Sequence, residues 1–321
     1  MKRIPILLLA ASVLAASLTA CGSPAASSSS APPSSAPSSA FQGYTFTDDL
    51  GRTVTVEQPE RVAALIGSFA DVWCLAGGQD TLVAAAHDAW TSFDLGLSET
   101  VADLGAVKEP NLEVLLAAQP DFILASCNTT ADLELESTFE SAGIPTAYFD
   151  IQSFEDYLNM LEICTALTGC PENYETYGLA VQEQVEAAKA RQDGSAPTVL
   201  TLRATGSSCK VKGSQDFLLG EMLSDLGCVN VADSDASLLE ELSLEAILAA
   251  DPDYIFAVLQ GSDASDAQET LEKTLLTNPA WQSLRAVQEG NFHTLEHSLY
   301  NLKPNARWGE AYEKLADILY P

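Results

Sequence analysis

Short apolar runs alternate with stretches of helical periodicity, twice along the chain. In the first half the pattern predicts strands at 61–66, 82–86, 121–125 and 146–149, and helices at 69–76, 111–118 and 133–142. In the second half it predicts strands at 198–202, 254–259 and 291–295, and helices at 217–226, 244–250, 271–276 and 305–319. Strands that alternate with helices predict parallel sheets covered on both faces, so the expected fold class is α/β.

Two segments depart from this alternation. Residues 44–56 alternate around a turn at Asp49-Leu50-Gly51, which predicts a β-hairpin. Residues 154–192 contain no strand pattern, and their apolar spacing predicts one or two long helices; Pro171 is acceptable in the first turn of a helix. We therefore expect a helical connector between two lobes, at 44–153 and 193–321.

The two lobes share a repeated unit. Residues 111–124 are NLEVLLAAQPDFIL, and residues 243–256 are SLEAILAADPDYIF. Each copy has a capping residue (Asn111 or Ser243), then Leu-Glu, an apolar helix, Pro-Asp and a strand. Two matching lobes would place the loops at the carboxyl ends of their strands around a shared cleft, where open α/β sheets bind ligands.

The first 43 residues have a different composition. Lys2 and Arg3 precede an apolar run that ends at Ala16, and Leu18-Thr19-Ala20-Cys21 follows. This layout is typical of a secretory signal, and its last four residues resemble a bacterial lipobox. We expect a lipoprotein signal peptide at 1–20 and a lipid on Cys21; the alternative is an ordinary signal peptide with Cys21 as a passenger thiol.

The segment at 21–43 is predicted to be a tether. Residues 22–40 contain only Gly, Ser, Pro and Ala, which bury too little to offset their ordering entropy. A lipidated cysteine followed by such a tether places the folded part at the extracellular face of the cytoplasmic membrane. That location favours capture of a ligand over cytoplasmic metabolism.

Composition and charge exclude several classes of protein. Of the 321 residues, 47% are hydrophobic, which is enough for a sizeable core. The chain has 15 Lys and Arg residues and 45 Asp and Glu residues, which give a net charge of −30. Removal of the signal peptide, which contains Lys2 and Arg3, changes the net charge to −32. A chain this acidic is repelled by phosphate backbones and by anionic lipid, so we expect no nucleic-acid partner and no membrane contact except through the lipid.

Six cysteines follow Cys21, an even number that permits disulfides in an exported protein. The preferred pairings are Cys164–Cys170 and Cys209–Cys228, which leave Cys74 and Cys127 unpaired. The alternative is a set of buried free thiols. No Cys-x-x-Cys motif occurs, so zinc ribbons and thioredoxin-type sites lack support.

Several motifs point to one family. They are residues 50–56 (LGRTVTV), Pro59-Glu60-Arg61-Val62, the two repeated units, the tail from Asn278 to Gly290 and the ending KPNARWGEAY at 303–312. Together they resemble the ABC-transporter substrate-binding proteins for ferric siderophores, haem and cobalamin, in a Gram-positive branch, over about residues 44–321. The resemblance implies two Rossmann-like lobes joined by a long rigid helix, with the ligand cleft between the lobes and little closure.

The same resemblance implies the function. We expect a lipid-anchored monomer that captures an iron complex, such as a ferric siderophore, hands it to a dimeric ABC permease, and needs no cofactor. Haem or cobalamin binding is the first alternative, and direct zinc or manganese binding the second. An exported hydrolase is the weakest alternative, because the chain has no Gly-x-Ser-x-Gly elbow, Walker loop or Gly-x-Gly-x-x-Gly motif; we therefore expect no enzyme.

Basic residues are concentrated in two segments of the second lobe. Of the 13 that remain after residue 20, five follow predicted strands: Arg203, Lys210, Lys212, Lys303 and Arg307. Their loops should line the cleft and attract an anionic chelate, with Arg203 and Arg307 ranked first because arginine bonds carboxylates bidentately. Lys108, in the other lobe, is a weaker candidate. The alternative is solvated charge for the lysines and structural roles for the arginines.

Aromatic and histidine side chains supply further candidates. Trp90 and Tyr300 follow strands and could form walls of the cleft, whereas Trp281 and Trp308 occupy helical packing positions. His87 and His297 are candidates for the cleft and for an axial bond to haem iron or corrinoid cobalt. His293 lies within a predicted strand and is expected to be a satisfied core residue. Without a His-rich loop we expect no bound metal ion.

The repeated units contain one more pair of candidates. Glu113 and Glu245 are each the third residue of a unit, one turn into a helix, where a carboxylate stabilises the helix end. Stabilisation of a helix end explains each glutamate separately, but it does not explain why a glutamate occurs at the same position in both units. The family resemblance implies that both sit on the cleft-side rim and dock onto arginines of the two permease subunits.

Overall fold

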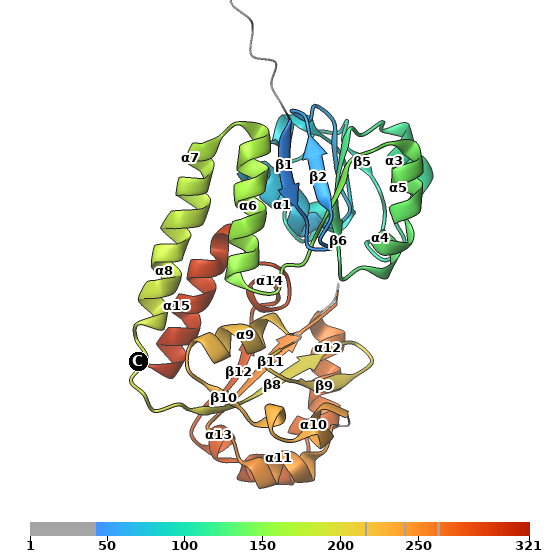
Figure 1. Cartoon of the computed structure of the whole chain (residues 1–321). Coiled ribbons are helices and arrows are strands. Elements are labelled where there is room, and N and C mark those ends of the chain that lie inside the picture. The colour runs from blue at the N-terminus through green and yellow to red at the C-terminus, as the bar shows by residue number, and fades with distance from the viewer. Residues whose placement is uncertain (1–42, 216, 241, 262–263) are drawn as a thin grey trace, which may run out of the picture. The chain divides into compact units, whose positions relative to one another are not determined.

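The computed structural model describes residues 43–215, 217–240, 242–261 and 264–321. The predicted signal peptide, Cys21 and all but the last residue of the predicted tether lie outside the described residues. The described residues form one compact unit, which contains two lobes with separate sheets (Figure 1). In the described ranges, no helix is both long and apolar enough to cross a membrane.

The N-terminal lobe is built on a five-stranded parallel sheet in the order β5-β4-β3-β6-β7. Its strands are β3 (Val62–Ala64), β4 (Leu82–Ala85), β5 (Ala102–Asp103), β6 (Phe122–Ser126) and β7 (Thr146–Phe149). Every residue of β6 and β7 is buried, as expected for strands covered on both faces. The predicted hairpin is confirmed as β1 (Tyr44–Thr47) and β2 (Thr53–Val56).

Short helices connect these strands. They are α1 (Gly67–Leu75), α2 (Asp88–Thr91), α3 (Leu112–Ala117), α4 (Thr130–Glu134) and α5 (Glu136–Ala142), with a 3₁₀ turn η1 (Gln79–Thr81). The predicted cap of α3 is confirmed, because Asn111 accepts a bond from the backbone N–H of Val114 at 3.1 Å. The single helix predicted at 133–142 is wrong: α4 and α5 are separate helices that meet at Leu135.

The C-terminal lobe has its own sheet, in the order β10-β8-β11-β12, with β9 paired to β8. The strands are β8 (Thr198–Ala204), β9 (Cys209–Lys212), β10 (Val229–Asn230), β11 (Tyr254–Leu259) and β12 (Phe292–Leu295). All pairs are parallel except β8–β9, an antiparallel hairpin that the sequence did not predict. Two separate sheets confirm the bilobal α/β prediction.

The helices of the C-terminal lobe are also short. They are α9 (Leu218–Asp225), α10 (Ala236–Glu240), α11 (Leu244–Ala250), α12 (Ala264–Leu271), α13 (Arg285–Gln288) and α14 (His297–Tyr300), with the turns η3 (Val231–Asp233), η4 (Glu272–Leu276), η5 (Pro279–Ser283) and η6 (Asn305–Arg307). Ser243 caps α11 by accepting from the N–H of Ala246 at 3.3 Å, as predicted. The helix expected at 271–276 is the π-helical end of a longer run that begins with α12.

The connector contains two antiparallel helical segments, and the second is the long helix that runs from the N-terminal lobe to the C-terminal lobe (Figure 1). The first, α6 (Phe154–Thr168), ends at Gly169, whose positive φ of 74° stops the helix. The second runs from α7 (Pro171–Tyr174) through the π-helical turn η2 (Glu175–Leu179) into α8 (Ala180–Lys189). The last helix, α15 (Trp308–Leu319), packs along α8 (Figure 1).

One apolar core extends through both lobes and the connector. Its buried members include residues of the N-terminal sheet, α6, α8, α9, β11 and α15. At its centre the ring of Trp308 meets that of Phe154 edge-on, with centroids 5.8 Å apart, and both are buried. Two smaller apolar clusters are each confined to one lobe. Trp281 is buried in one of them, and Trp308 is buried in the shared core, so the predicted packing roles of both tryptophans are confirmed.

A buried amide adds a polar connection to this core. The Nδ2 atom of Asn305 donates to the backbone carbonyl of Ser68 at 2.9 Å and to the carboxylate of Asp71 at 2.8 Å. Asn305 precedes α15, and Ser68 and Asp71 belong to α1 of the N-terminal lobe. The end of the chain therefore returns to the first lobe and fixes it against the second.

All six described cysteines are free thiols, so the predicted Cys164–Cys170 and Cys209–Cys228 disulfides are wrong. Burial, with a contribution from the nearby Asp71, raises the pKa of Cys74 to about 12. Burial also raises the pKa of Cys209 to about 11 and that of Cys228 to about 12. Thiols in such surroundings stay protonated and react slowly, which fits packing roles.

Truncating the shared core should destabilise the whole unit. Trp308→Ala is expected to lower the free energy of unfolding by about 3–5 kcal/mol, because it removes a fully buried indole between the lobes. Urea unfolding followed by circular dichroism measures this. Leu239→Ala, at an exposed leucine, is the control and should change stability by less than about 0.5 kcal/mol. Equal effects of the two changes would contradict the shared core.

Candidate functional site

A cavity of about 760 Å³ lies between the two lobes. The N-terminal lobe contributes Thr91 and Ser92, at the end of α2. The C-terminal lobe contributes the segments that follow β11 and β12: Gln260, Gly261, Glu296, His297, Ser298, Asn301 and Leu302. The cavity therefore occupies the expected position, at the carboxyl ends of parallel strands. We call it the interlobe cavity.

The wall of the interlobe cavity carries mainly neutral polar groups and one carboxylate. Glu296 accepts hydrogen bonds from the hydroxyl of Ser298, from Arg307 at 3.1 Å and from Lys314 at 3.3 Å. The bond from Ser298 and those from the two cations lower the pKa of Glu296, against the effect of its partial burial. The carboxylate stays ionised, and its charge is balanced from outside the cavity.

Arg307 is the partner of that carboxylate rather than a free cation. It also forms an ion pair with Glu310 at 2.7 Å, and these bonds raise the pKa of the guanidinium. The bond from Arg307 and a second from Lys314 lower the pKa of Glu310 to about 2. Because two carboxylates already balance Arg307, its predicted role as a free anchor for an anionic ligand is not supported by its surroundings.

Lys303 lines a smaller pocket of about 200 Å³ next to the interlobe cavity, together with Asp71 and Arg307. Among the described residues its ammonium forms no hydrogen bond or ion pair. Burial lowers the pKa of Lys303, although the carboxylates of Asp150 and Asp156 oppose this shift. Lys303 is thus a partly desolvated cation beside the cleft.

Arg203 lies on β8, not in a loop as the sequence suggested. It pairs in register with Val258 of β11 and with Lys210 of β9, so Arg203 and Lys210 project from the same face of the sheet. Lys210 is exposed, whereas the Nε atom of Arg203 is buried and has no hydrogen-bond partner. The guanidinium forms no ion pair within the described part of the chain.

The end of β8 connects Arg203 to the interlobe cavity. Its neighbour Ala204 accepts a hydrogen bond from the backbone N–H of Gln260 at 2.7 Å, and Gln260 forms part of the cavity wall. Of the two arginines ranked first from the sequence, Arg203 is therefore the one with an unsatisfied donor, and its strand ends at the cavity wall.

The two predicted aromatic walls differ in exposure. Trp90 is half-buried and packs against the shared core, close to Thr91 of the cavity wall. Tyr300 is only 1% exposed, and its hydroxyl donates to the backbone carbonyl of Ala311 at 3.0 Å. The prediction of Tyr300 as a cavity wall is corrected: it is a packing residue of the core.

The three histidines have different surroundings. His297 lines the interlobe cavity, and its Nδ1 lies 2.9 Å from the carbonyl oxygen of Leu259. His87 is exposed, and its Nδ1 lies 2.7 Å from the carboxylate of Asp103. His293 stacks on Phe256, but its Nε2 is buried without a partner, so the expectation of a satisfied core histidine is wrong. Burial lowers the pKa of His293.

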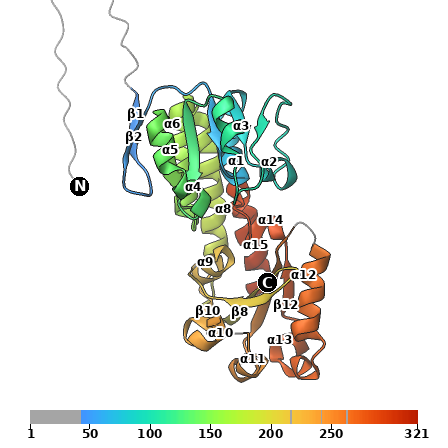
Figure 2. The same cartoon turned by 90° about the vertical axis from the view of Figure 1, so that its right-hand side faces the viewer.

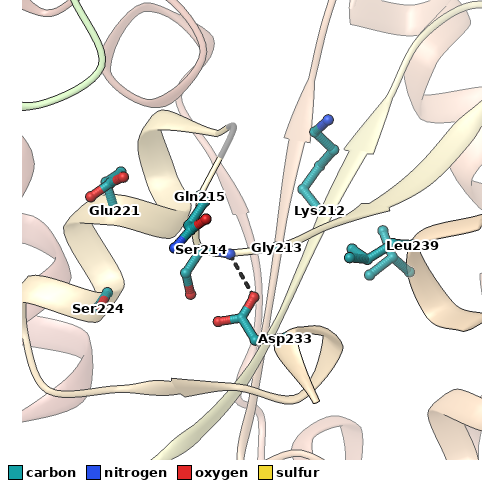
Figure 3. Close-up of a pocket in the computed structure, with 9 residues that line it drawn as sticks. Lys212, Gly213, Ser214, Gln215, Glu221, Ser224, Asp233 and Leu239 are labelled. Carbon is teal, nitrogen blue, oxygen red and sulfur yellow. Dashed lines mark hydrogen bonds between the residues drawn. The ribbon is translucent and has the colours of Figure 1, made fainter. Parts of the chain in front are cut away.

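Two other cavities lie within single lobes. Lys108 lines one of about 380 Å³ with Asn128 and Thr129, beyond β6. Figure 3 shows the second, of about 690 Å³, where the N–H of Ser214 donates to Asp233 at 2.8 Å and Glu221 projects from α9. All lining residues of each come from one lobe, which distinguishes both from the interlobe cavity. In the described ranges, no group of three or more His, Cys, Asp or Glu side chains is arranged to hold a metal ion.

Glu113 and Glu245 are exposed in the first turns of α3 and α11. Both views place α11 at the end of the C-terminal lobe that is remote from the N-terminal lobe (Figures 1 and 2). The expected position on the cleft-side rim is therefore wrong for α11. The two glutamate-bearing helices are instead widely separated on one compact unit.

Several cavity residues were missed from the sequence: Thr91, Ser92, Gln260, Glu296, Ser298 and Asn301. They are neutral or acidic, whereas the candidates that the sequence predicts are cations, histidines and aromatic side chains. Two of them could have been predicted from their position, because Gln260 and Glu296 directly follow the strands predicted at 254–259 and 291–295.

Comparisons with known proteins agree with this arrangement. Residues 62–299 match the periplasmic binding protein family. The Fe(3+)-citrate-binding protein YfmC of Bacillus subtilis is 27% identical over 266 residues, which cover 79% of this chain and 78% of YfmC.

Two solved structures show the same fold. The iron uptake ABC transporter substrate-binding protein PiuA of Streptococcus pneumoniae has a TM-score of 0.68 at 20% identity, and the match covers 88% of this chain and 99% of PiuA. The periplasmic vitamin B12 binding protein BtuF of Vibrio cholerae has a TM-score of 0.67 at 19% identity, and the match covers 82% and 98% of the two chains.

Asp132 should make stability depend on pH. It is fully buried beside the end of β6, and burial raises its pKa to about 7, although a bond from the N–H of Ser126 opposes the shift. A raised pKa favours the folded state while the carboxyl is protonated, so its contribution to stability falls as pH rises from about 4 to about 7. Asp132→Asn should remove this decline in urea unfolding at pH 5 and pH 8. Asp94→Asn, at an exposed aspartate, is the control and should retain it; a decline unchanged in Asp132→Asn would contradict this account.

Proposed function

The chain belongs to the periplasmic binding protein family, and we propose that it captures an anionic ferric chelate and hands it to an ABC permease. The observation that carries this proposal is the interlobe cavity, which is lined by both lobes and adjoins the end of β8, the strand on which the buried Nε of Arg203 has no partner. A relative of similar length, YfmC, is named for binding ferric citrate, an anionic chelate. The name of this relative and the two unpartnered cations near the cleft, Arg203 and Lys303, favour the same class of ligand.

The charge of the chain supports an internal anchor for an anion. A net charge of −30 repels a free anion, so an anionic ligand needs a local cation. Arg203 and Lys303 are the two candidate cations near the cleft that lack a partner among the described residues. We propose that Arg203 bonds the chelate directly and that Lys303 adds positive potential from the adjoining pocket. His87, Trp90 and Lys108 remain proposed contacts at the periphery, whereas Lys210, which is exposed and outside the wall of the interlobe cavity, is not proposed as a contact.

The N-terminal segment completes this proposal. A lipid on Cys21 and a tether at 21–43 would hold the binding unit at the extracellular face of the membrane, next to its permease. Labelling with a fatty acid analogue would test the anchor: Cys21→Ser should abolish incorporation of the label, and incorporation in that variant would place the lipid elsewhere.

The proposed ligand class can be tested by titration of the purified protein with ferric citrate, haemin and cobalamin, monitored by tryptophan fluorescence. Ferric citrate should bind, and hydrolytic turnover should be absent. Binding of haemin or cobalamin alone would shift the proposal to that ligand. Binding of free zinc or manganese, without any chelate, would contradict it.

Removal of Arg203 should weaken binding of the anionic chelate. Arg203→Ala is expected to lose about 1.5–3 kcal/mol, or roughly 10- to 150-fold in affinity, because a charge-assisted hydrogen bond is lost. Lys210→Ala, at the exposed cation opposite Arg203 in register, is the matched control and should change affinity little. Equal affinities of wild type and Arg203→Ala for ferric citrate would show that Arg203 does not contact the ligand.

We propose that Glu113 and Glu245 dock onto the two subunits of the permease. Their helices are repeats of one unit and lie far apart, as a two-fold partner requires. Glu113→Ala with Glu245→Ala should leave chelate affinity unchanged and reduce transport into vesicles reconstituted with the permease, more than either single change does. Exposed ion pairs of this kind mainly set encounter rate and register. Full transport by the double variant would leave the glutamates with only a helix-end role.

A further inference from the structure

The smaller pocket of about 200 Å³, which we call the side pocket, adjoins the interlobe cavity. The two share Ser92, Ser298 and Leu302 in their walls, so they are contiguous. Pockets that hold a whole small ligand usually measure about 300–1,000 Å³, so the side pocket has room for only part of a ligand. A ligand in the interlobe cavity can therefore place one substituent there.

The side pocket carries one acid and one base, each from a different lobe. Asp71 belongs to α1 of the N-terminal lobe, and Lys303 precedes η6 in the C-terminal lobe. The two form no ion pair with each other, although both line the pocket. Arg307, which also lines it, is already paired with Glu296 and Glu310. A group bound here would thus meet two uncompensated charges of opposite sign.

One oxygen of Asp71 is available to such a group. Its Oδ2 accepts from the Nδ2 atom of Asn305 at 2.8 Å. Its Oδ1 forms no hydrogen bond within the described ranges, and it is not enclosed by the protein. Burial raises the pKa of Asp71, and the bond from Asn305 opposes this shift. A cation against Oδ1 would stabilise the ionised carboxylate and offset the effect of burial.

Lys303 offers the complementary charge. Its ammonium forms no hydrogen bond or ion pair in the described part of the chain, and it is not enclosed either. Burial lowers the pKa of Lys303, and the carboxylates of Asp150 and Asp156, which do not bond to it, oppose this shift. An anion against the ammonium would stabilise its charged form.

A group with a single charge satisfies only one of these two residues. An anion would pair with Lys303 but be repelled by Asp71, and a cation would pair with Asp71 but be repelled by Lys303. A free α-amino acid head carries an ammonium and a carboxylate on one carbon atom, so it can pair with both. Its few atoms also suit a pocket of about 200 Å³.

We propose that the side pocket binds a zwitterionic α-amino acid head of the chelator, with the carboxylate against Lys303 and the ammonium against Asp71. The preferred ligand is then a ferric chelate that carries a free α-amino acid group. This inference rests on the proposed function and names the class of chelator within it. A free amino acid has the same chemistry, but it would leave the interlobe cavity empty and should bind far more weakly.

The experiment titrates the purified protein with three ferric tris-catecholates that differ in one substituent, monitored by tryptophan fluorescence. The first carries an α-amino acid head, the second an aminoethyl group without the carboxylate, and the third an N-acetylated head without the ammonium. Wild type should bind the first about 10-fold or more tightly than either of the others, because each of these lacks one charge-assisted bond. Free serine is the fourth probe.

Two variants should each lose a different part of this preference. Lys303→Gln should no longer distinguish the α-amino acid head from the aminoethyl group, and Asp71→Asn should no longer distinguish it from the N-acetylated head. Asp71→Asn keeps an oxygen that can accept from Asn305, so the buried bond between the lobes is retained. A merely structural effect would weaken binding of all three chelates alike.

Asp80→Asn and Lys210→Gln are the matched controls. They make the same changes at exposed residues that line neither the interlobe cavity nor the side pocket, so both variants should keep the preference of wild type.

The outcomes distinguish this inference from the proposed function. Equal affinity of wild type for the three chelates would leave the proposed function standing and overturn the role of the side pocket. A preference that Asp71→Asn and Lys303→Gln both retain would overturn it as well. If wild type binds none of the chelates, both proposals fail, and binding of free serine in that case would identify an amino acid as the cargo.

Discussion

The apolar core that both lobes share is the constraint on which the rest of the structure depends. The lobes have separate sheets, and each has a smaller cluster of its own, but the largest cluster includes residues from both and from α6, α8 and α15. Trp308 and Phe154 meet within it, and Asn305 connects the start of α15 to α1. A large rotation of one lobe would expose this apolar surface and break buried hydrogen bonds, so little closure is expected.

A cleft that changes little must be shaped before the ligand arrives. The cavity walls are therefore set by the strands and by short helices, with α2 on one side and the segments after β11 and β12 on the other. Two of its polar side chains are oriented by hydrogen bonds to groups outside the cavity wall: His297 bonds the carbonyl of Leu259, and Glu296 accepts from Arg307 and Lys314. Arg203 is the exception, because its buried Nε lacks a partner. An unsatisfied buried donor costs free energy that the rest of the fold must offset.

The fold was largely predictable from the sequence, because buried parallel strands and capped helices leave local patterns. The apolar runs at 121–125 and 254–259 and the caps at Asn111 and Ser243 are examples. Elements without such a pattern were missed. The strand β9 has only four residues, with two lysines on one side, and the break at Gly169 lies between two helical segments of similar periodicity.

The site was less predictable, since partners from distant segments decide what each side chain can do. Sequence ranked Arg203 and Arg307 equally, but only Arg307 meets Glu296 and Glu310. Tyr300 follows a strand, as a residue of the cavity wall would, yet it is buried in the core and its hydroxyl donates to the backbone carbonyl of Ala311. The cysteine count permitted disulfides, but the thiols are free and buried or half-buried. These outcomes depend on three-dimensional contacts that residue type and spacing do not encode.

A crystal structure of the protein with a bound ferric chelate would test the central claim most directly. The account predicts a chelate in the interlobe cavity, between Thr91 of one lobe and His297 of the other, with Arg203 within hydrogen-bond distance of the chelate. The two lobes should keep nearly the same relative orientation as in crystals without the chelate. A chelate bound in the cavity of Ser214 and Asp233 instead, or a large rotation between the lobes, would contradict it.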